Sequence, residues 1–144
     1  MFYFPLGATK ESLKSKFEFY DLFMCYVNKS NKPQIICGDF NRIVSELEGY
    51  NPDLLRKTTG FLPEEEKWVN DFLNSGFIDS DYFNKKPENY TWWTYSRNSR
   101  GKNNEYRLDY FLVNDKLRDN IVNADILNGI YGLDHTLLLL ELEF

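Results

Sequence analysis

Ile35–Asn41 reads IICGDFN, a short apolar run that ends abruptly on a carboxylate and an amide. A run of this length and composition predicts a buried strand. Asp39 and Asn41 alternate with Phe40, so both polar side chains can lie on one side of the chain while Phe40 points back to the core. Such a pair either orients a water and a phosphate oxygen or caps its own backbone in a turn. The residues alone leave both interpretations open.

Acidic residues also interrupt two later apolar segments. Asp109 lies within RLDYFLV, residues 107–113, and Asp134 precedes His135, the single histidine of the chain. A carboxylate in apolar surroundings is costly unless it is paired or holds a metal ion. Three such sites in one chain predict a phosphoester-cleaving centre. The alternatives are an ion pair between Arg107 and Asp109, and a hydrogen-bonded histidine at the start of an edge strand.

Adjacent residues on a strand point to opposite faces, which constrains the last of these sites. If Asp134 and His135 both act in catalysis, the backbone that carries them has to be a turn.

Length and composition indicate a single domain, residues 1–144, with a sizeable core. Hydrophobic residues make up 42% of the chain and the formal net charge is −5, which argues against wholesale electrostatic capture of nucleic acid but leaves room for a local basic face. Cys25 and Cys37 lie in apolar stretches, and we expect both to be buried, reduced thiols. With no apolar run of about 20 residues and no visible signal peptide, the chain is expected to be cytoplasmic and free of membranes.

Apolar spacing predicts two helices and a set of strands. Helical spacing covers residues 10–28, and a second helix opens at Pro63, followed by three glutamates, and ends before Gly76. The expected strands are residues 2–4, 34–38, 90–95, 107–113, 122–127 and 137–142. Helices and strands are interspersed, so the predicted class is an α+β or α/β layered domain.

A loop rich in aromatic, basic and amide side chains follows one of these strands. Flat rings offer faces for bases or a sugar, and cations offer contacts for phosphates. Alternation predicts that one of its two tryptophans faces inward and the other outward, the outward one being functional. The alternative is a core tryptophan followed by a solvated loop. The candidate DNA-binding residues are Trp92, Trp93, Arg97, Asn98, Arg100, Lys102 and Asn103.

Taken together, these segments resemble the endonuclease/exonuclease/phosphatase superfamily, and more closely its exonuclease III-type AP endonucleases. The resemblance runs through almost the whole chain and depends on the order and spacing of several motifs. These motifs are YFPLG at residues 3–7, KFEFYD at 16–21, IICGDFN at 35–41, GFLPEE at 60–65, YTWW at 90–93 and RLDYF at 107–111.

The resemblance implies the C-terminal part of a four-layer α/β sandwich of the DNase I-like type, lacking the N-terminal half. Such a part would expose a sheet face or edge, which a separate N-terminal fragment or self-association would cover. The implied substrate is DNA, especially at abasic sites and 3′ ends. The alternatives are an inactive DNA-binding or fragment-complementing module, and another phosphoesterase of the superfamily that acts on phospholipids or inositol phosphates.

The same resemblance implies roles for individual residues. Tyr3 would contact the scissile phosphate or its nucleophile, and Asp39 would orient or deprotonate the attacking water. Asn41 would position the phosphate, and Asp109 would support the site electrostatically. His135 would stabilise charge on the phosphate.

A divalent metal ion, Mg²⁺ or Mn²⁺, is also implied, with Asp134, Asp39 and Asn41 as its candidate ligands. Carboxylate and amide oxygens suit such an ion, which neutralises charge as a phosphodiester is attacked. Asp134 would alternatively orient the neighbouring histidine. Glu46 or Glu48 is a further candidate ligand.

Overall fold

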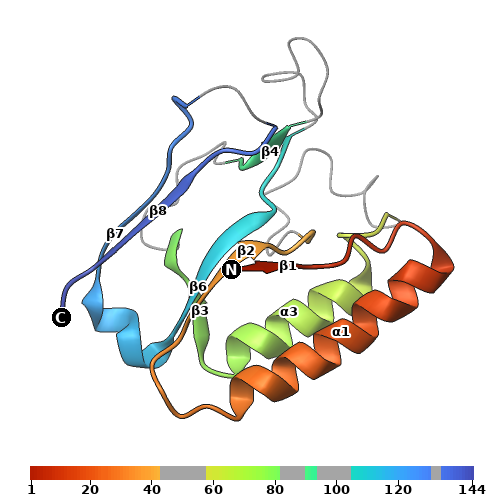
Figure 1. Ribbon diagram of the computed structural model, residues 1–144, viewed down its shortest axis with the longest axis horizontal. Helices are drawn as coiled ribbons and strands as arrows, with labels where there is room; N and C mark the ends of the chain where they lie inside the picture. Colours follow the sequence, from red (N-terminus) through yellow and green to blue (C-terminus); the bar gives the residue numbers. More distant parts are fainter. Residues whose placement is uncertain (43–57, 82–89, 94–104, 131–133) are drawn as a thin grey trace.

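The computed structural model describes residues 1–42, 58–81, 90–93, 105–130 and 134–144. A four-stranded sheet forms the centre of the fold, with strand order β1-β2-β6-β3. β1 (Phe2–Tyr3) runs parallel to β2 (Ile35–Asp39), and β6 (Asp109–Asn114) pairs antiparallel with both β2 and β3 (Phe77–Asp79). Two helices lie on one side of this sheet (Figure 1).

The two helices are α1 (Lys10–Asn28) and α3 (Pro63–Asn74), and both agree with the sequence prediction. Thr9 caps α1, because its side chain accepts a hydrogen bond from the Ser12 backbone N–H. Three acidic residues in the first turn of α3 suit the positive end of its dipole. Gly76 follows α3 with φ +104°, a left-handed conformation that favours glycine.

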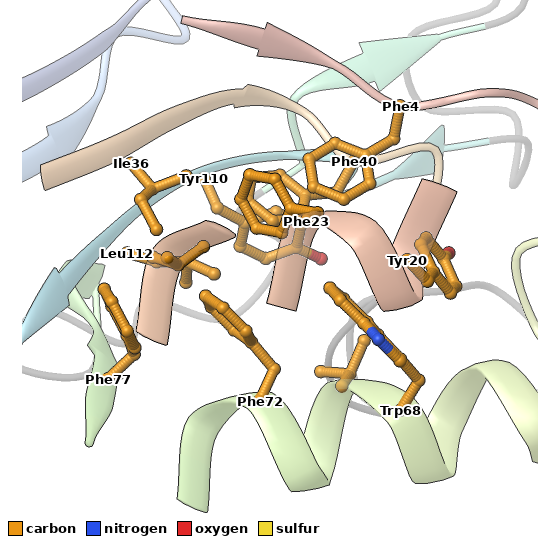
Figure 2. Packing of buried hydrophobic residues seen from close by; sticks show 12 residues of the cluster. Phe4, Tyr20, Phe23, Ile36, Phe40, Trp68, Phe72, Phe77, Tyr110 and Leu112 are labelled. Atoms are coloured by element: carbon orange, nitrogen blue, oxygen red, sulfur yellow. The ribbon is translucent and has the colours of Figure 1, made fainter. Parts of the chain in front are cut away.

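Aromatic rings from both helices and from the sheet fill the core between them (Figure 2). Phe4 stacks on Phe40 with ring centroids 4.3 Å apart, and Tyr20 stacks on Trp68 at 4.1 Å. Trp68 in turn stacks on Phe72 at 5.3 Å. The helix-covered side of the sheet is therefore a closely packed aromatic layer.

The second face of the sheet, opposite the helices, carries Tyr3, Ile35, Asp39 and Asp109. The assignment follows from strand alternation: Ile36 is in the core at 4% exposure, whereas its neighbour Ile35 is 44% exposed. Figure 1 shows the hairpin of β7 (Ile121–Ile126) and β8 (Leu138–Leu142) on this side of β6.

The remaining described elements are short. β4 (Trp92–Trp93) pairs antiparallel with β5 (Glu105–Tyr106), and a 3₁₀ helix, η3 (Asp115–Asn120), joins β6 to β7. The predicted layered α+β class is confirmed. Strands β3 and β5 were missed, because runs of two or three residues are too short to show alternation.

The expectation of two buried thiols was wrong for Cys25. Its side chain is exposed, because it lies on the outer surface of α1 between the exposed Leu22 and Tyr26, while Cys37 is partly buried. Both cysteines are free thiols. Within the part of the chain that the structure describes, no helix is long and apolar enough to cross a membrane.

Candidate active site

Three of the predicted catalytic residues lie in one row across neighbouring strands. Tyr3 of β1 is paired with Asp39 of β2, and Asp39 is paired with Asp109 of β6. Residues directly opposite each other on adjacent strands point to the same face. The second face of the sheet therefore presents a tyrosine and two neighbouring carboxylates.

Asp39 combines burial with a local hydrogen bond. Its side chain Oδ1 accepts from the Asn41 backbone N–H at 2.7 Å, and the residue is 8% exposed. Burial raises the pKa of the Asp39 carboxyl, and the nearby Asp109 charge adds to this, while the Asn41 hydrogen bond and the His135 charge oppose it. The net effect raises the pKa, so Asp39 accepts a proton more readily than an exposed aspartate does.

Asn41 ends the strand in a turn. Its φ is +46°, a left-handed conformation, and its side-chain Nδ2 donates to the Phe4 carbonyl oxygen at 2.8 Å. The alternative in which Asp39 caps its own backbone is thus correct as a description of the turn. It does not compete with a catalytic role, because the same turn fixes both side chains beside β1.

The sole histidine joins this row. His135 Nδ1 lies 2.8 Å from Asp109 Oδ2, and this hydrogen bond is the main reason that the pKa of His135 is raised, although burial opposes it. The backbone bends at Asp134, and His135 forms an isolated bridge to Trp92. The described backbone therefore bends at the first of the two adjacent candidate residues, while the second is in a β-bridge.

Arg107 does not pair with Asp109, so that alternative was wrong. Its guanidinium forms two hydrogen bonds of 2.7 Å to the Asp79 carboxylate and lies 3.6 Å from Asp81. This bidentate pair joins the segment before β6 to β3. Asp109 is left to hydrogen-bond with His135 instead.

Thr91 connects the start of β6 to the segment that follows His135. Its role was not predicted from the sequence. Its fully buried hydroxyl accepts hydrogen bonds from the backbone N–H groups of Leu108 at 2.9 Å and Asp109 at 3.0 Å. Its carbonyl accepts from the Thr136 backbone N–H at 2.9 Å. A threonine before the two tryptophans was the only sequence signal, and it is also typical of an ordinary strand.

The two tryptophans differ as predicted. Trp93 is 6% exposed, whereas Trp92 is only partly buried and stacks on Tyr106 with centroids 5.6 Å apart. Phe61 contacts the other partner of this stack, Tyr106, edge-on at 5.4 Å. The remaining loop candidates, Arg97, Asn98, Arg100, Lys102 and Asn103, lie outside the described residues, as do Glu46 and Glu48.

The described residues suit a loosely held divalent ion better than a closed metal cage. Among them, no group of three or more His, Cys, Asp or Glu side chains is arranged to enclose a metal. Asp39 and Asp109 nevertheless offer carboxylate oxygens side by side. Mg²⁺ is commonly held by one or two carboxylates, with water and substrate phosphate completing its shell. The carboxylate oxygens of Asp39 and Asp109 fit this mode of metal binding.

The fold is that of known DNA-processing enzymes. An AP endonuclease from Archaeoglobus fulgidus superimposes with a TM-score of 0.88 at 19% identity, over 99% of this chain and 60% of that one. A Neisseria 3′ phosphatase bound to a product DNA hairpin gives a TM-score of 0.87 at 20% identity, over 99% of this chain and 59% of that one. These likenesses confirm the predicted fold, part of a DNase I-like α/β sandwich.

Sequence comparison defines the family. Residues 12–135 match the Endonuclease/Exonuclease/phosphatase family. The DNA-(apurinic or apyrimidinic site) endonuclease of Dictyostelium discoideum is 36% identical over 141 residues, 92% of this chain and 39% of that protein. The exodeoxyribonuclease of Bacillus subtilis is 32% identical over 130 residues, 87% of this chain and 51% of that protein.

The chain belongs to the Endonuclease/Exonuclease/phosphatase family. A DNA repair nuclease of Danio rerio is 36% identical over 115 residues, 78% of this chain. The matches span between 37% and 51% of the length of these three curated relatives.

Proposed function

We propose that this chain acts in a DNA-repair nuclease that hydrolyses phosphodiesters at abasic sites and 3′ ends with the aid of Mg²⁺ or Mn²⁺. The observation that carries the proposal is the meeting of Asp39, Asp109 and His135, from separate parts of the chain, on one face of the sheet. The relatives named as AP endonucleases and exodeoxyribonucleases support the choice of DNA.

The residues of the row divide the chemistry among them. Asp39, with its raised pKa and its carboxylate oriented by the Asn41 N–H, takes the proton of the attacking water. His135 donates its Nδ1–H to Asp109, and in the protonated ring, which the raised pKa of His135 favours, the opposite nitrogen donates to a phosphate oxygen. Tyr3, 72% exposed at the edge of the sheet, reaches the phosphate from the other side.

A bound divalent ion would neutralise charge that builds up on the phosphate during attack. Asp39, Asn41 and Asp134 remain the proposed ligands, and the Asp109 carboxylate beside Asp39 is a further oxygen donor. The identity of the metal and a cytoplasmic location stay predictions.

DNA contacts are proposed to come from the aromatic pair beside the row. Trp92 and Tyr106 stack with an interplanar angle of 15° and offer a flat surface for a base or sugar. Trp92 and His135 pair through an isolated β-bridge, so this surface lies next to the proposed phosphate site. The basic and amide residues between 97 and 103 would contact the backbone phosphates.

An incision assay tests the proposal. A duplex oligonucleotide with one abasic site should be cut in the presence of Mg²⁺ and left intact with EDTA. Asp39→Asn should abolish this cutting, because it removes the proton acceptor. Asp119→Asn, which makes the same change on the exposed surface of η3, should cut like the wild type. Failure of the wild-type chain to cut at high concentration would overturn the proposal.

A second candidate, a module that acts through association, is favoured by the apolar groups on the second face. Tyr3 and Ile35 are 72% and 44% exposed there. Burying such groups against another chain, or against a second copy, is favourable. Sedimentation of the pure chain tests this candidate, because a monodisperse monomer over a wide concentration range would contradict self-association.

A further inference from the structure

Lys16 and Glu65 form an ion pair that is completely shielded from solvent. Lys16 Nζ lies 2.5 Å from Glu65 Oε1, and both side chains have 0% exposure. The free-energy cost of desolvating two charges can exceed the Coulombic attraction gained when they pair. A buried ion pair is therefore weak evidence that its role is to stabilise the fold. Both residues belong to the helices that cover the side of the sheet opposite to the proposed chemistry. The backbone groups that Lys16 and Glu65 bind indicate the role of the pair.

Lys16 connects α1 to the turn that carries the site. Its ammonium donates to the Asn41 carbonyl oxygen at 3.0 Å and to the Leu6 carbonyl oxygen at 3.4 Å. With Glu65 as the third partner, all of its donors are engaged. One ammonium thus joins the segment after β1 to the end of β2.

Glu65 connects the same ammonium to the segment in front of α3. Its Oε2 accepts from the backbone N–H groups of Gly60 at 2.6 Å and Leu62 at 3.0 Å. Gly60 in turn lies against the turn: its carbonyl accepts from Arg42 Nη1 at 2.7 Å, and a Cβ on Gly60 would come within 3.1 Å of the Asn41 carbonyl oxygen. The start of α3 is therefore packed directly on the backbone of Asn41.

This arrangement holds Asn41 in a left-handed conformation, with φ +46°. Asparagine tolerates this conformation better than most residues with a Cβ, but it is still less favourable than the right-handed one. Its side chain is held by Phe4 and its carbonyl by Lys16. Its backbone N–H, so placed, donates to the Asp39 carboxylate at 2.7 Å. The orientation of Asp39 thus depends on Lys16 through a single residue.

We propose that Lys16 and Glu65 are positioning residues, which fix the Asp39–Asn41 turn and thereby aim the Asp39 carboxylate without touching the substrate. This inference rests on the proposed nuclease function for its consequence in catalysis. Its structural content, that the buried pair maintains the hydrogen bond between Asn41 and Asp39, stands independently of any activity.

The alternative is that the pair merely stabilises the fold, and a double substitution separates the two. Lys16→Met and Glu65→Gln each leave one buried group without its partner and should lower stability sharply. The double variant K16M/E65Q removes both charges and should regain most of that loss. It still lacks the donor to the Asn41 carbonyl, so the turn should stay misplaced.

The first measurement is amide hydrogen exchange of Asn41 by NMR, which reports its hydrogen bond to Asp39 directly. In K16M/E65Q, exchange at Asn41 should be faster by at least about tenfold, while exchange at Ile36 in the same strand stays near the wild-type rate. Native protection of Asn41 in the refolded double variant would overturn the proposal. Lys67→Met, which breaks an exposed pair with Asp71 on α3, serves as the control and should change neither amide.

The second measurement is cleavage of the abasic duplex. K16M/E65Q should lose about 10- to 100-fold in kcat with little change in KM, because a displaced general base affects the chemical step more than binding. Full recovery of kcat together with stability would show a purely structural role and overturn the proposal.

Two further outcomes remain decisive. If K16M/E65Q does not fold in buffer alone, the exchange measurement is made on the variant and the wild type in a stabilising osmolyte such as TMAO, with the same expected loss of protection at Asn41. If the wild-type chain does not cleave DNA, the proposed function fails while the exchange result still supports or overturns the role of the pair.

Discussion

The two faces of the central sheet differ in what they bury. Towards α1 and α3, the strands contribute apolar side chains to an aromatic layer, in which Ile36 and Tyr110 are almost fully enclosed (Figure 2). The second face carries Asp39, Asp109 and the exposed Tyr3. The same strands thus supply the packed core on one side and the proposed reactive groups on the other, and alternation along the chain is enough to separate them.

The charged pairs on the two sides of the sheet also differ in burial. Lys16 and Glu65, on the helix side, are fully buried and fully partnered. Asp109 and His135, on the second face, keep side-chain exposures of 16% and 33%. The enclosed pair suits the proposed positioning role, because it contacts only protein groups. The partly exposed pair suits the proposed chemical role, because a substrate can reach it.

The largest expected effect tests the difference between the faces with two adjacent isoleucines. Ile36→Ala should lower the free energy of unfolding by about 2–5 kcal/mol, because it leaves a cavity in the core. Ile35→Ala makes the same change in the same strand at a half-exposed site and should cost less than about 1 kcal/mol. Urea denaturation of both variants measures the contrast.

Equal losses for the two variants would contradict the assignment of the faces. A loss for Ile35→Ala that grows with protein concentration would instead indicate that another copy of the chain covers the second face.

A smaller effect is expected from the two tryptophans. Trp92→Ala should weaken binding to single-stranded or abasic DNA by about 1–3 kcal/mol, the usual worth of one aromatic stacking contact. Trp93→Ala, at a buried position, should instead lower stability and leave the affinity of the folded fraction unchanged. Fluorescence anisotropy with a labelled oligonucleotide measures binding. Loss of affinity in Trp93→Ala alone would reverse the roles.

Much of this architecture was predictable from local patterns. The first helix was located by its apolar spacing, and the second by Pro63 and the glutamates that follow it. The row of Tyr3, Asp39 and Asp109 was anticipated through the polar interruption of apolar runs and the resemblance to a family. Its alignment across three strands is a matter of register, which no single segment encodes.

The sequence could not reveal which distant residues the buried charged side chains pair with. Arg107 lies two residues from Asp109 and was a reasonable partner for it, yet it binds Asp79, 28 positions away. Nothing in the sequence marked Lys16 and Glu65 as core residues, since lysine and glutamate are rarely buried. Their pairing depends on how the two helices pack beside each other against the sheet, which periodicity does not specify.

The smallest expected effect concerns the pair of Asp109 and His135. Because the pKa of His135 is raised above its ordinary 6.5, the protonated ring contributes stability that is present at low pH and is lost as pH rises through the raised value. Asp109→Asn removes the partner, so this variant should be less stable than the wild type at about pH 5.5 and closer to it at about pH 8.5.

The chain has one histidine, so its ring signal gives the pKa by NMR without assignment. In metal-free protein, Asp109→Asn should lower the midpoint of that titration, and Asp119→Asn should leave it unchanged. A midpoint unaffected by Asp109→Asn would mean that the 2.8 Å contact does not govern the charge of His135. The proposed roles would then lose the support for their proton donor, because the ring nitrogen opposite Nδ1 carries a proton only when the ring is charged.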